Sequence, residues 1–202
     1  MNRLPNEILQ SEILIHLPYP DIKNICFVDK RMQSICNSEE FWKRKAINDF
    51  EISKEAFLGI QPDNDAKKSV AMNKKRYEFL YYFLPSSINR QLYLASKIGN
   101  EALVDFLVEK RNAKSYDSAM GTAANGGYQN IINKMLKLGA KDYGRAMVNA
   151  ADSGNEGIVK QMLDLIDKFG TPYKKSYTWA INAAIKSGHQ HIANLIRNRS
   201  NN

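Results

Sequence analysis

Residues 147–158 read MVNAADSGNEGI, and this stretch decides the fold because its pattern returns three more times in the C-terminal half of the chain. An apolar residue is followed three positions later by alanine, after four more positions by glycine, and after another four by an aliphatic residue. The other copies are residues 92–103 (LYLASKIGNEAL), 120–131 (MGTAANGGYQNI) and 181–192 (INAAIKSGHQHI). Four copies at similar intervals indicate an internal repeat.

The spacing within each copy indicates stacked helix pairs. The repeat glycines, Gly99, Gly127, Gly154 and Gly188, lie 28, 27 and 34 residues apart. A small alanine allows close approach of a first helix, the glycine turns the chain, and the aliphatic residues pack a second helix against the next unit. Apolar residues recur at three- and four-residue spacing through most of the chain, without an alternating strand pattern. We therefore expect an all-α protein.

The four copies resemble ankyrin repeats, and the resemblance covers residues 88–199. Gly139-Ala140 and Gly188-His189 stand where that family has its Gly-Ala and Gly-His pairs. The family's Thr-Pro-Leu-His opening is absent, and the shorter copies are about six residues below the ~33-residue ankyrin period. This departure predicts shortened fingers, with tight turns in place of β-hairpins. The longer connection over residues 168–175 is the one place where a loop is expected to project.

Ankyrin proteins bind partners on their concave face, and the resemblance implies which residues of this chain would contact a target protein. The positions concerned are the two residues before each repeat glycine and the turn before each first helix. The expected target-binding residues are Lys97, Ile98, Asn125, Asp152, Ser153, Lys186, Asp117, Arg145 and Trp179. Trp179 is the best candidate anchor, because exposed large aromatics dominate binding energy; burial against the last repeat is the equal alternative.

The first fifty residues contain signals for several short helices. Pro5 suits the first turn of a helix that must stop at Leu17-Pro18. Asp21 can cap a second helix, and Ser38 can cap another that carries the pair Phe41-Trp42. Because about fifty residues cannot close a large core alone, this unit either leans on the rest of the chain or buries a face on a partner.

This segment resembles an F-box over about residues 3–48. The resemblance rests on Leu4-Pro5-x-Glu7-Ile8, Ile13-Leu14-x-x-Leu17-Pro18-x-x-Asp21-Ile22, Val28-x-Lys30-Arg31 and Phe41-Trp42. It implies docking on the Skp adaptor, which joins a cullin scaffold and places a bound target before a ubiquitin-loaded conjugating enzyme. The expected contact residues are Leu4, Pro5, Ile8, Ile13, Leu14, Leu17, Pro18 and Val28. The alternative is a helical cap packed only on its own chain, because periodicity alone does not separate inward from outward faces.

The sequence divides into four segments. We expect an F-box-like domain at 1–50, a helical linker at 51–87, about four repeats at 88–199 and a tail at 200–202. The boundary is Leu84-Pro85-Ser86-Ser87, where proline ends a helical run. The basic cluster Lys74-Lys75-Arg76 is either a targeting or nucleic-acid signal or the solvated face of a helix that buries Tyr77 and Leu80.

Composition narrows the class of protein further. The 202 residues carry a net charge of +8, with 44% hydrophobic and 25% charged residues, which excludes a disordered or fibrous chain. No stretch approaches the ~20 uninterrupted apolar residues of a membrane span, so a cytoplasmic location is expected and a nuclear one stays open. Cys26 and Cys36 lack metal-ligand spacing and are expected to be buried free thiols in a reducing compartment.

Residue types give no argument for catalysis, and we expect no cofactor or metal. His189 and His191 lie two residues apart at a helix start, which directs them to different sides, and no third ligand accompanies them. The repeats carry most of the positive charge, but acidic residues are interleaved with it. This pattern favours an acidic protein target over a nucleic acid, which a continuous basic stripe would suit better.

The leading hypothesis is a non-catalytic substrate-recognition subunit of a Skp–cullin–F-box ubiquitin ligase, monomeric outside that complex. An F-box followed by ankyrin repeats is similar to host-directed proteins of giant DNA viruses and intracellular bacteria, which act inside a host cell. One alternative is a non-degradative repeat protein that scaffolds or sequesters a host protein. Another is a nucleic-acid binder, suggested by a pI of about 9.4.

Overall fold

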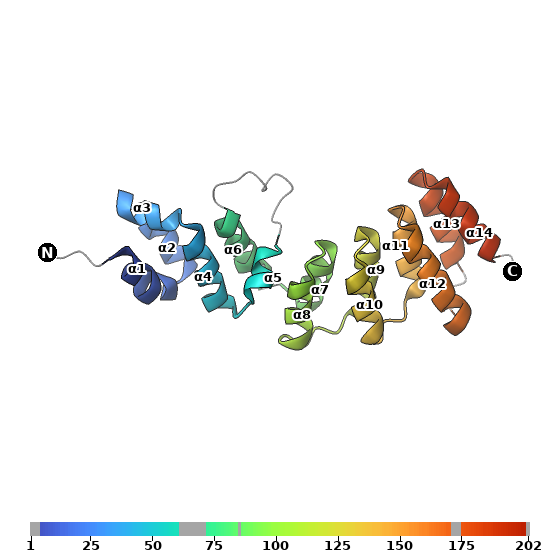
Figure 1. Ribbon diagram of the computed structural model, residues 1–202, viewed down its shortest axis with the longest axis horizontal. Coiled ribbons are helices and arrows are strands. Elements are labelled where there is room, and N and C mark those ends of the chain that lie inside the picture. Colours follow the sequence, from blue (N-terminus) through green and yellow to red (C-terminus); the bar gives the residue numbers. More distant parts are fainter. Residues whose placement is uncertain (1–4, 61–71, 85, 171–174, 201–202) are drawn as a thin grey trace. The chain divides into compact units, whose positions relative to one another are not determined.

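The computed structural model describes residues 5–60, 72–84, 86–170 and 175–200, and within these ranges the chain is helical without a strand (Figure 1). The all-α expectation is confirmed for this part of the protein. In chain order the elements are α1 (Asn6–Ile8), the π-helical turn η1 (Leu9–Ile13), the 3₁₀ turn η2 (Leu14–His16), α2 (Tyr19–Ile25), α3 (Lys30–Cys36), α4 (Glu39–Phe50), α5 (Lys54–Leu58), α6 (Met72–Phe83), α7 (Ile88–Lys97), α8 (Glu101–Glu109), α9 (Tyr116–Gly126), α10 (Gln129–Lys137), α11 (Tyr143–Asp152), α12 (Glu156–Phe169), α13 (Ser176–Lys186) and α14 (Gln190–Ser200).

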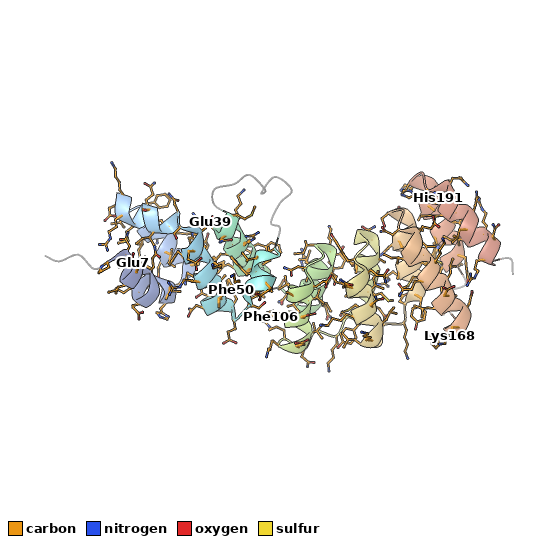
Figure 2. All side chains as sticks on the ribbon, in the orientation of Figure 1. Glu7, Glu39, Phe50, Phe106, Lys168 and His191 are labelled. Atoms are coloured by element: carbon orange, nitrogen blue, oxygen red, sulfur yellow. A yellow bond between two sulfur atoms is a disulfide. The ribbon has the colours of Figure 1, made fainter. Side chains whose placement is uncertain are left out.

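The chain divides into two compact units, residues 1–87 and 88–202. In the first unit, Trp42 of α4 lies at the centre of an aromatic core. Its indole Nε1–H donates a hydrogen bond to the carbonyl of Cys36 at 2.6 Å, and its ring centroid lies 5.1 Å from that of Tyr77 on α6. Phe50, labelled in Figure 2, also lies 5.1 Å from Tyr77. Helix α6, which we expected in a linker, therefore belongs to the core of this unit.

A buried polar network connects α4 to two other elements of the first unit. The ammonium of Lys45 donates to the carbonyl of Ile15 at 2.8 Å and forms an ion pair with Asp49 at 2.8 Å. Asp49 also accepts a hydrogen bond from the hydroxyl of Tyr77 at 2.5 Å. Burial, and then this hydrogen bond, raise the pKa of Tyr77. Because each buried polar group has a partner, the network fixes η2 and α6 on α4.

Two expectations about the first unit are wrong. Cys26 and Cys36 form a disulfide, with their Cα atoms 5.7 Å apart. The expectation of free thiols rested on the apolar neighbours of the two cysteines, their lack of metal-ligand spacing and a reducing compartment, whereas the packing of α2 beside α3 brings both cysteines together. Asp21 does not cap α2, because the helix begins at Tyr19 after Pro18; Pro20 is tolerated in the first turn, where its missing N–H has no helical partner. Ser38 does cap α4, as expected.

The second unit consists of four helix pairs, α7–α8, α9–α10, α11–α12 and α13–α14. The first helices of the pairs pack on one another in sequence, α7 on α9, α9 on α11 and α11 on α13 (Figure 1). The repeat alanines, Ala95, Ala123, Ala150 and Ala184, are fully buried at these contacts. Their small side chains let neighbouring helices approach closely, so the stack follows from the repeat spacing.

Each repeat glycine adopts a left-handed backbone, with φ between +70° and +82°. The residue that follows the next repeat glycine covers it. The ring of His189 lies 2.6 Å from the position that a Cβ on Gly154 would occupy. The side chain of Asn155 lies 3.0 Å from the position of a Cβ on Gly127. Gly188 has no neighbour within 4 Å of the same point among the described residues. We call this arrangement of a glycine and its covering residue the repeat joint.

The turns between pairs are short. Residues 110–115 connect α8 to α9, and residues 138–142 connect α10 to α11, in both cases without a strand. The expected loop over residues 168–175 is partly helical, because α12 continues to Phe169. Residues 171–174 lie outside the described residues.

Candidate protein-binding surfaces

The first unit exposes several of the apolar residues expected to bind the Skp adaptor. Pro5, Ile8, Ile13, Pro18 and Val28 are exposed, and Val28 keeps 71% of its surface accessible. Single exposed apolar residues are common on proteins, so exposure makes these side chains accessible to a partner without identifying one.

Two other expected adaptor contacts lie deeper in the first unit, and a third is not placed. Leu17 is half-buried, and Leu14 lies in the core with 3% of its surface accessible. Leu4 lies outside the described residues. The exposed members of the expected set are therefore the ones available to a partner.

Phe27 was missed by the sequence analysis, although it is the most exposed large apolar residue among those described, at 86%. It lies beside Val28 in the turn between α2 and α3. The guanidinium of Arg31 donates to the Asn6 side chain at 2.7 Å, which brings the start of α3 next to α1. Ile22 and Cys26 are buried and lie four residues apart, which is the spacing of one helix face. Phe27 is the next residue and falls outside that spacing, and this was the sequence signal for its exposure. We define the N-terminal apolar surface as Pro5, Ile8, Ile13, Pro18, Phe27 and Val28.

In the second unit, the residues expected to bind a target form two rows, one at each end of the first helices. The row at the C-terminal ends is Lys97, Ile98, Asn125, Asp152, Ser153 and Lys186, exposed except for the half-buried Ile98. The row at the N-terminal ends is Asp117, Arg145 and Trp179, all exposed. Trp179 keeps 51% of its surface accessible, so it is available to a partner.

The acidic residues of these rows are engaged within the stack. Asp117 accepts hydrogen bonds from the backbone N–H groups of Lys141 and Asp142 at 2.6 and 2.8 Å, which fixes the turn before α11. Asp152 accepts from the hydroxyl of Ser187 at 2.7 Å. Asp142 caps α11 by accepting from the backbone N–H of Arg145 at 3.1 Å. Asp117 and Asp152 therefore connect neighbouring repeats, whereas Asp142 stabilises the start of its own helix.

Several lysines at the same helix ends have no acidic partner among the described residues. These are Lys97, Lys141, Lys175 and Lys186, and all four are exposed. These lysines therefore present positive charge that is not held in ion pairs, next to the carboxylates of Asp117, Asp142 and Asp152.

A cleft of about 280 Å³ lies between α11 and α13. It is lined by Asp142, Arg145, Val148, Ser176 and Trp179. Two residues expected to bind a target, Arg145 and Trp179, therefore share one cleft, although they belong to different repeats. Asp142, Val148 and Ser176 were not expected there, because the sequence does not show which residues of adjacent repeats meet.

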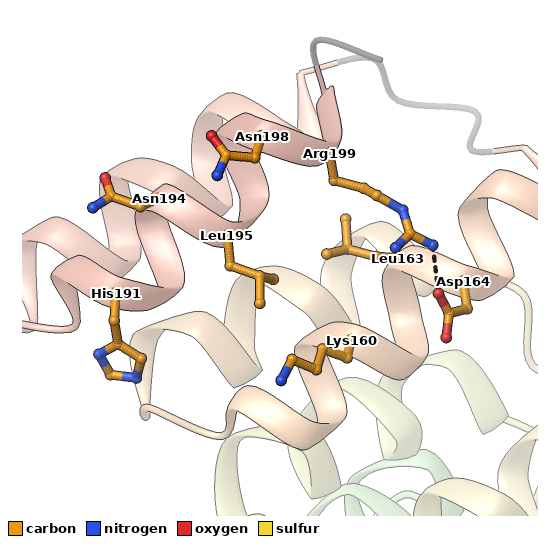
Figure 3. Close-up of a pocket in the computed structure, with 8 residues that line it drawn as sticks. All are labelled: Lys160, Leu163, Asp164, His191, Asn194, Leu195, Asn198 and Arg199. Carbon is orange, nitrogen blue, oxygen red and sulfur yellow. Dashed lines mark hydrogen bonds and ion pairs between the residues drawn. The ribbon is translucent and has the colours of Figure 1, made fainter.

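A larger hollow of about 700 Å³ lies between the second helices α12 and α14 (Figure 3). Leu163 and Leu195 form its apolar part. Its charged groups are paired with one another: Arg199 with Asp164 at 2.5 Å and Lys160 with Glu156 at 2.5 Å. These internal ion pairs leave little charge free to select a ligand.

Polar side chains bridge the grooves between successive second helices. Between α8 and α10, Lys134 pairs with Asp105 across the groove, and between α10 and α12 Gln161 bonds to Gln129 at 2.8 Å. The corresponding residue of α14 is Leu195, which has no hydrogen-bonding group. In this last groove Arg199 of α14 provides the polar bridge instead, because it pairs with Asp164 and Asp167 of α12 at 2.5 and 2.6 Å.

Comparison of the chain with models of known protein families found no match, and comparison with curated proteins found none either. Among the described residues, no cluster of three or more His, Cys, Asp or Glu side chains has a geometry that could hold a metal ion. No helix in the described ranges combines the length and apolar character needed to cross a membrane.

Proposed function

We propose that this protein is the substrate-recognition adaptor of a Skp–cullin–F-box ubiquitin ligase. The first unit docks on the Skp adaptor through the N-terminal apolar surface, and the second unit binds the target protein as an ankyrin-type stack. The complex acts in the cytoplasm or nucleus of a host cell. The exposure of Ile8, Ile13 and Val28, at positions where the F-box resemblance implies contact, is the observation that carries this proposal.

Burial against a partner would stabilise the side chains of the N-terminal apolar surface. Each large apolar side chain left in water forgoes about 1.5–3 kcal/mol relative to full burial. Phe27 and Val28 are held in place by the turn between α2 and α3, where the backbone N–H of Val28 donates to the carbonyl of Ile25 at 3.0 Å. A turn fixed in this way loses little conformational entropy when a partner covers it.

Calorimetric titration of the full chain with purified Skp adaptor tests the proposal. We expect binding, and we expect the double substitution Ile13→Asp and Val28→Asp to weaken it at least tenfold, because buried charges replace apolar contacts. Phe169→Asp is the matched control, since Phe169 is a similarly exposed apolar residue of the second unit. Absence of adaptor binding by folded wild-type protein would reject the ligase assignment and favour a sequestering repeat protein.

A further inference from the structure

We infer that the cleft between α11 and α13 binds an acidic peptide segment of the target, with a carboxylate on Arg145 and a large apolar side chain on Trp179. This deepens the proposed function, because it rests on the second unit acting as the target reader. Four observations carry it: the fixed position of Arg145, the exposure of Trp179, the apolar wall at Val148, and the unpaired lysines nearby.

Arg145 is positioned before any ligand arrives. Its Cδ atom lies 3.1 Å from where a Cβ on Gly121 would stand, so the aliphatic stem crosses the backbone of α9. Its Nε lies 3.2 Å from the carboxylate of Asp142. A guanidinium has five N–H donors, and no second acidic side chain pairs with this one in the described residues. The remaining donors form a planar fork suited to a carboxylate.

Trp179 supplies the apolar half of the cleft. Its indole is half exposed although it lies within a helix pair, and Val148 of the neighbouring first helix lines the same cleft. An indole offers a large rigid contact surface, and tryptophan and arginine are the residue types that most often dominate binding energy. Trp179 and Arg145 together favour a peptide in which an apolar side chain lies next to an acidic one.

Charge favours an acidic peptide over a nucleic acid. Lys141 precedes α11 and Lys175 precedes α13, so both lie in the chain segments that lead into the cleft helices. Asp142 lines the cleft and is paired with Arg145, so the described lining offers one cation rather than the row of cations that a run of phosphates requires. A peptide carboxylate needs only the fork of Arg145, and its flanking acidic residues can approach the lysines.

The test is a selection of random peptides displayed on phage, carried out on the full chain at about 0.15 M salt. Enriched peptides are synthesised with a fluorescent label and titrated by fluorescence polarisation. We expect enriched sequences to join acidic residues to an aromatic or aliphatic one. Trp179→Ala should weaken these peptides about tenfold or more, and Arg145→Ala about tenfold. Lys160→Ala, on the opposite layer of helices, is the control and should leave affinity unchanged.

Two results would overturn the inference. One is the absence of enriched acidic peptides, or their equal binding to the Trp179→Ala variant. The other is tighter binding of single-stranded oligothymidylate than of any peptide, lost in the same variant, which would assign the cleft to nucleic acid. Because the selection contains no Skp adaptor, its failure is separate from a failure of the adaptor titration.

Discussion

Replacing Gly154 by alanine tests the repeat joint against a matched position in the same protein. Gly154 and Gly188 have nearly equal backbone angles, with φ of +79° and +82°. Alanine at either site therefore carries the same left-handed backbone penalty, about 1–2 kcal/mol. At Gly154 the new Cβ would also stand 2.6 Å from the ring of His189, whereas at Gly188 it would meet nothing within 4 Å.

The difference between the two variants measures the packing of one repeat on the next. Overpacking in a close-fitting contact adds about 1–3 kcal/mol, so we expect Gly154→Ala to lower the free energy of unfolding by about 2–5 kcal/mol and Gly188→Ala by about 1–2 kcal/mol. Urea unfolding followed by far-ultraviolet circular dichroism measures both. Adding His189→Ala to Gly154→Ala should recover most of the extra loss. Equal losses at the two glycines would refute the repeat joint.

Three further predictions concern the first unit. Lys45→Met should lower the free energy of unfolding by about 2–3 kcal/mol, because it leaves the partly buried Asp49 without its cation; a change below about 0.5 kcal/mol in urea unfolding would contradict the network. Reduction of the Cys26–Cys36 disulfide, which closes a loop with a sequence separation of 10, should cost about 2–3 kcal/mol on the chain-entropy estimate, and a Cys26→Ser variant should show no response to reductant. The pKa of Tyr77 is raised in the folded protein, so its contribution to stability is complete below its unfolded pKa of about 10 and is lost as the pH rises above that value. Urea unfolding between about pH 9 and pH 11 should therefore show a steep decline that Tyr77→Phe makes shallower, and an unchanged slope in that variant would show that Tyr77 is not responsible.

Features that depend on neighbouring positions in the chain could be predicted from the sequence. Gly154 needs a left-handed backbone and Ala150 needs close approach of another helix; both requirements are visible in residue type and spacing. The all-helical fold follows from the same periodicity. The repeat was therefore recognisable without knowledge of any contact.

Features that depend on contacts between distant segments could not be predicted. The meeting of Trp42 with Tyr77 and the pairing of Cys26 with Cys36 require the relative placement of helices, which periodicity does not contain. For the same reason, the sequence did not show that Ile13 is exposed and that Leu14 is buried. The π-helical turn η1 shifts the register of side chains there, so a count by 3.6 residues assigns the wrong face.

Because the same repeat joint recurs between successive helix pairs, helix pairs could be added to the second unit or removed from it. The segment from Tyr128 to Gly154 carries a residue that covers Gly99 at one end and a glycine that receives His189 at the other. Duplication of that segment in a gene would place a like residue over a like glycine at the new junction. The number of repeats can therefore change while each contact between repeats stays of the same kind. The length of the binding surface can then change independently of the first unit.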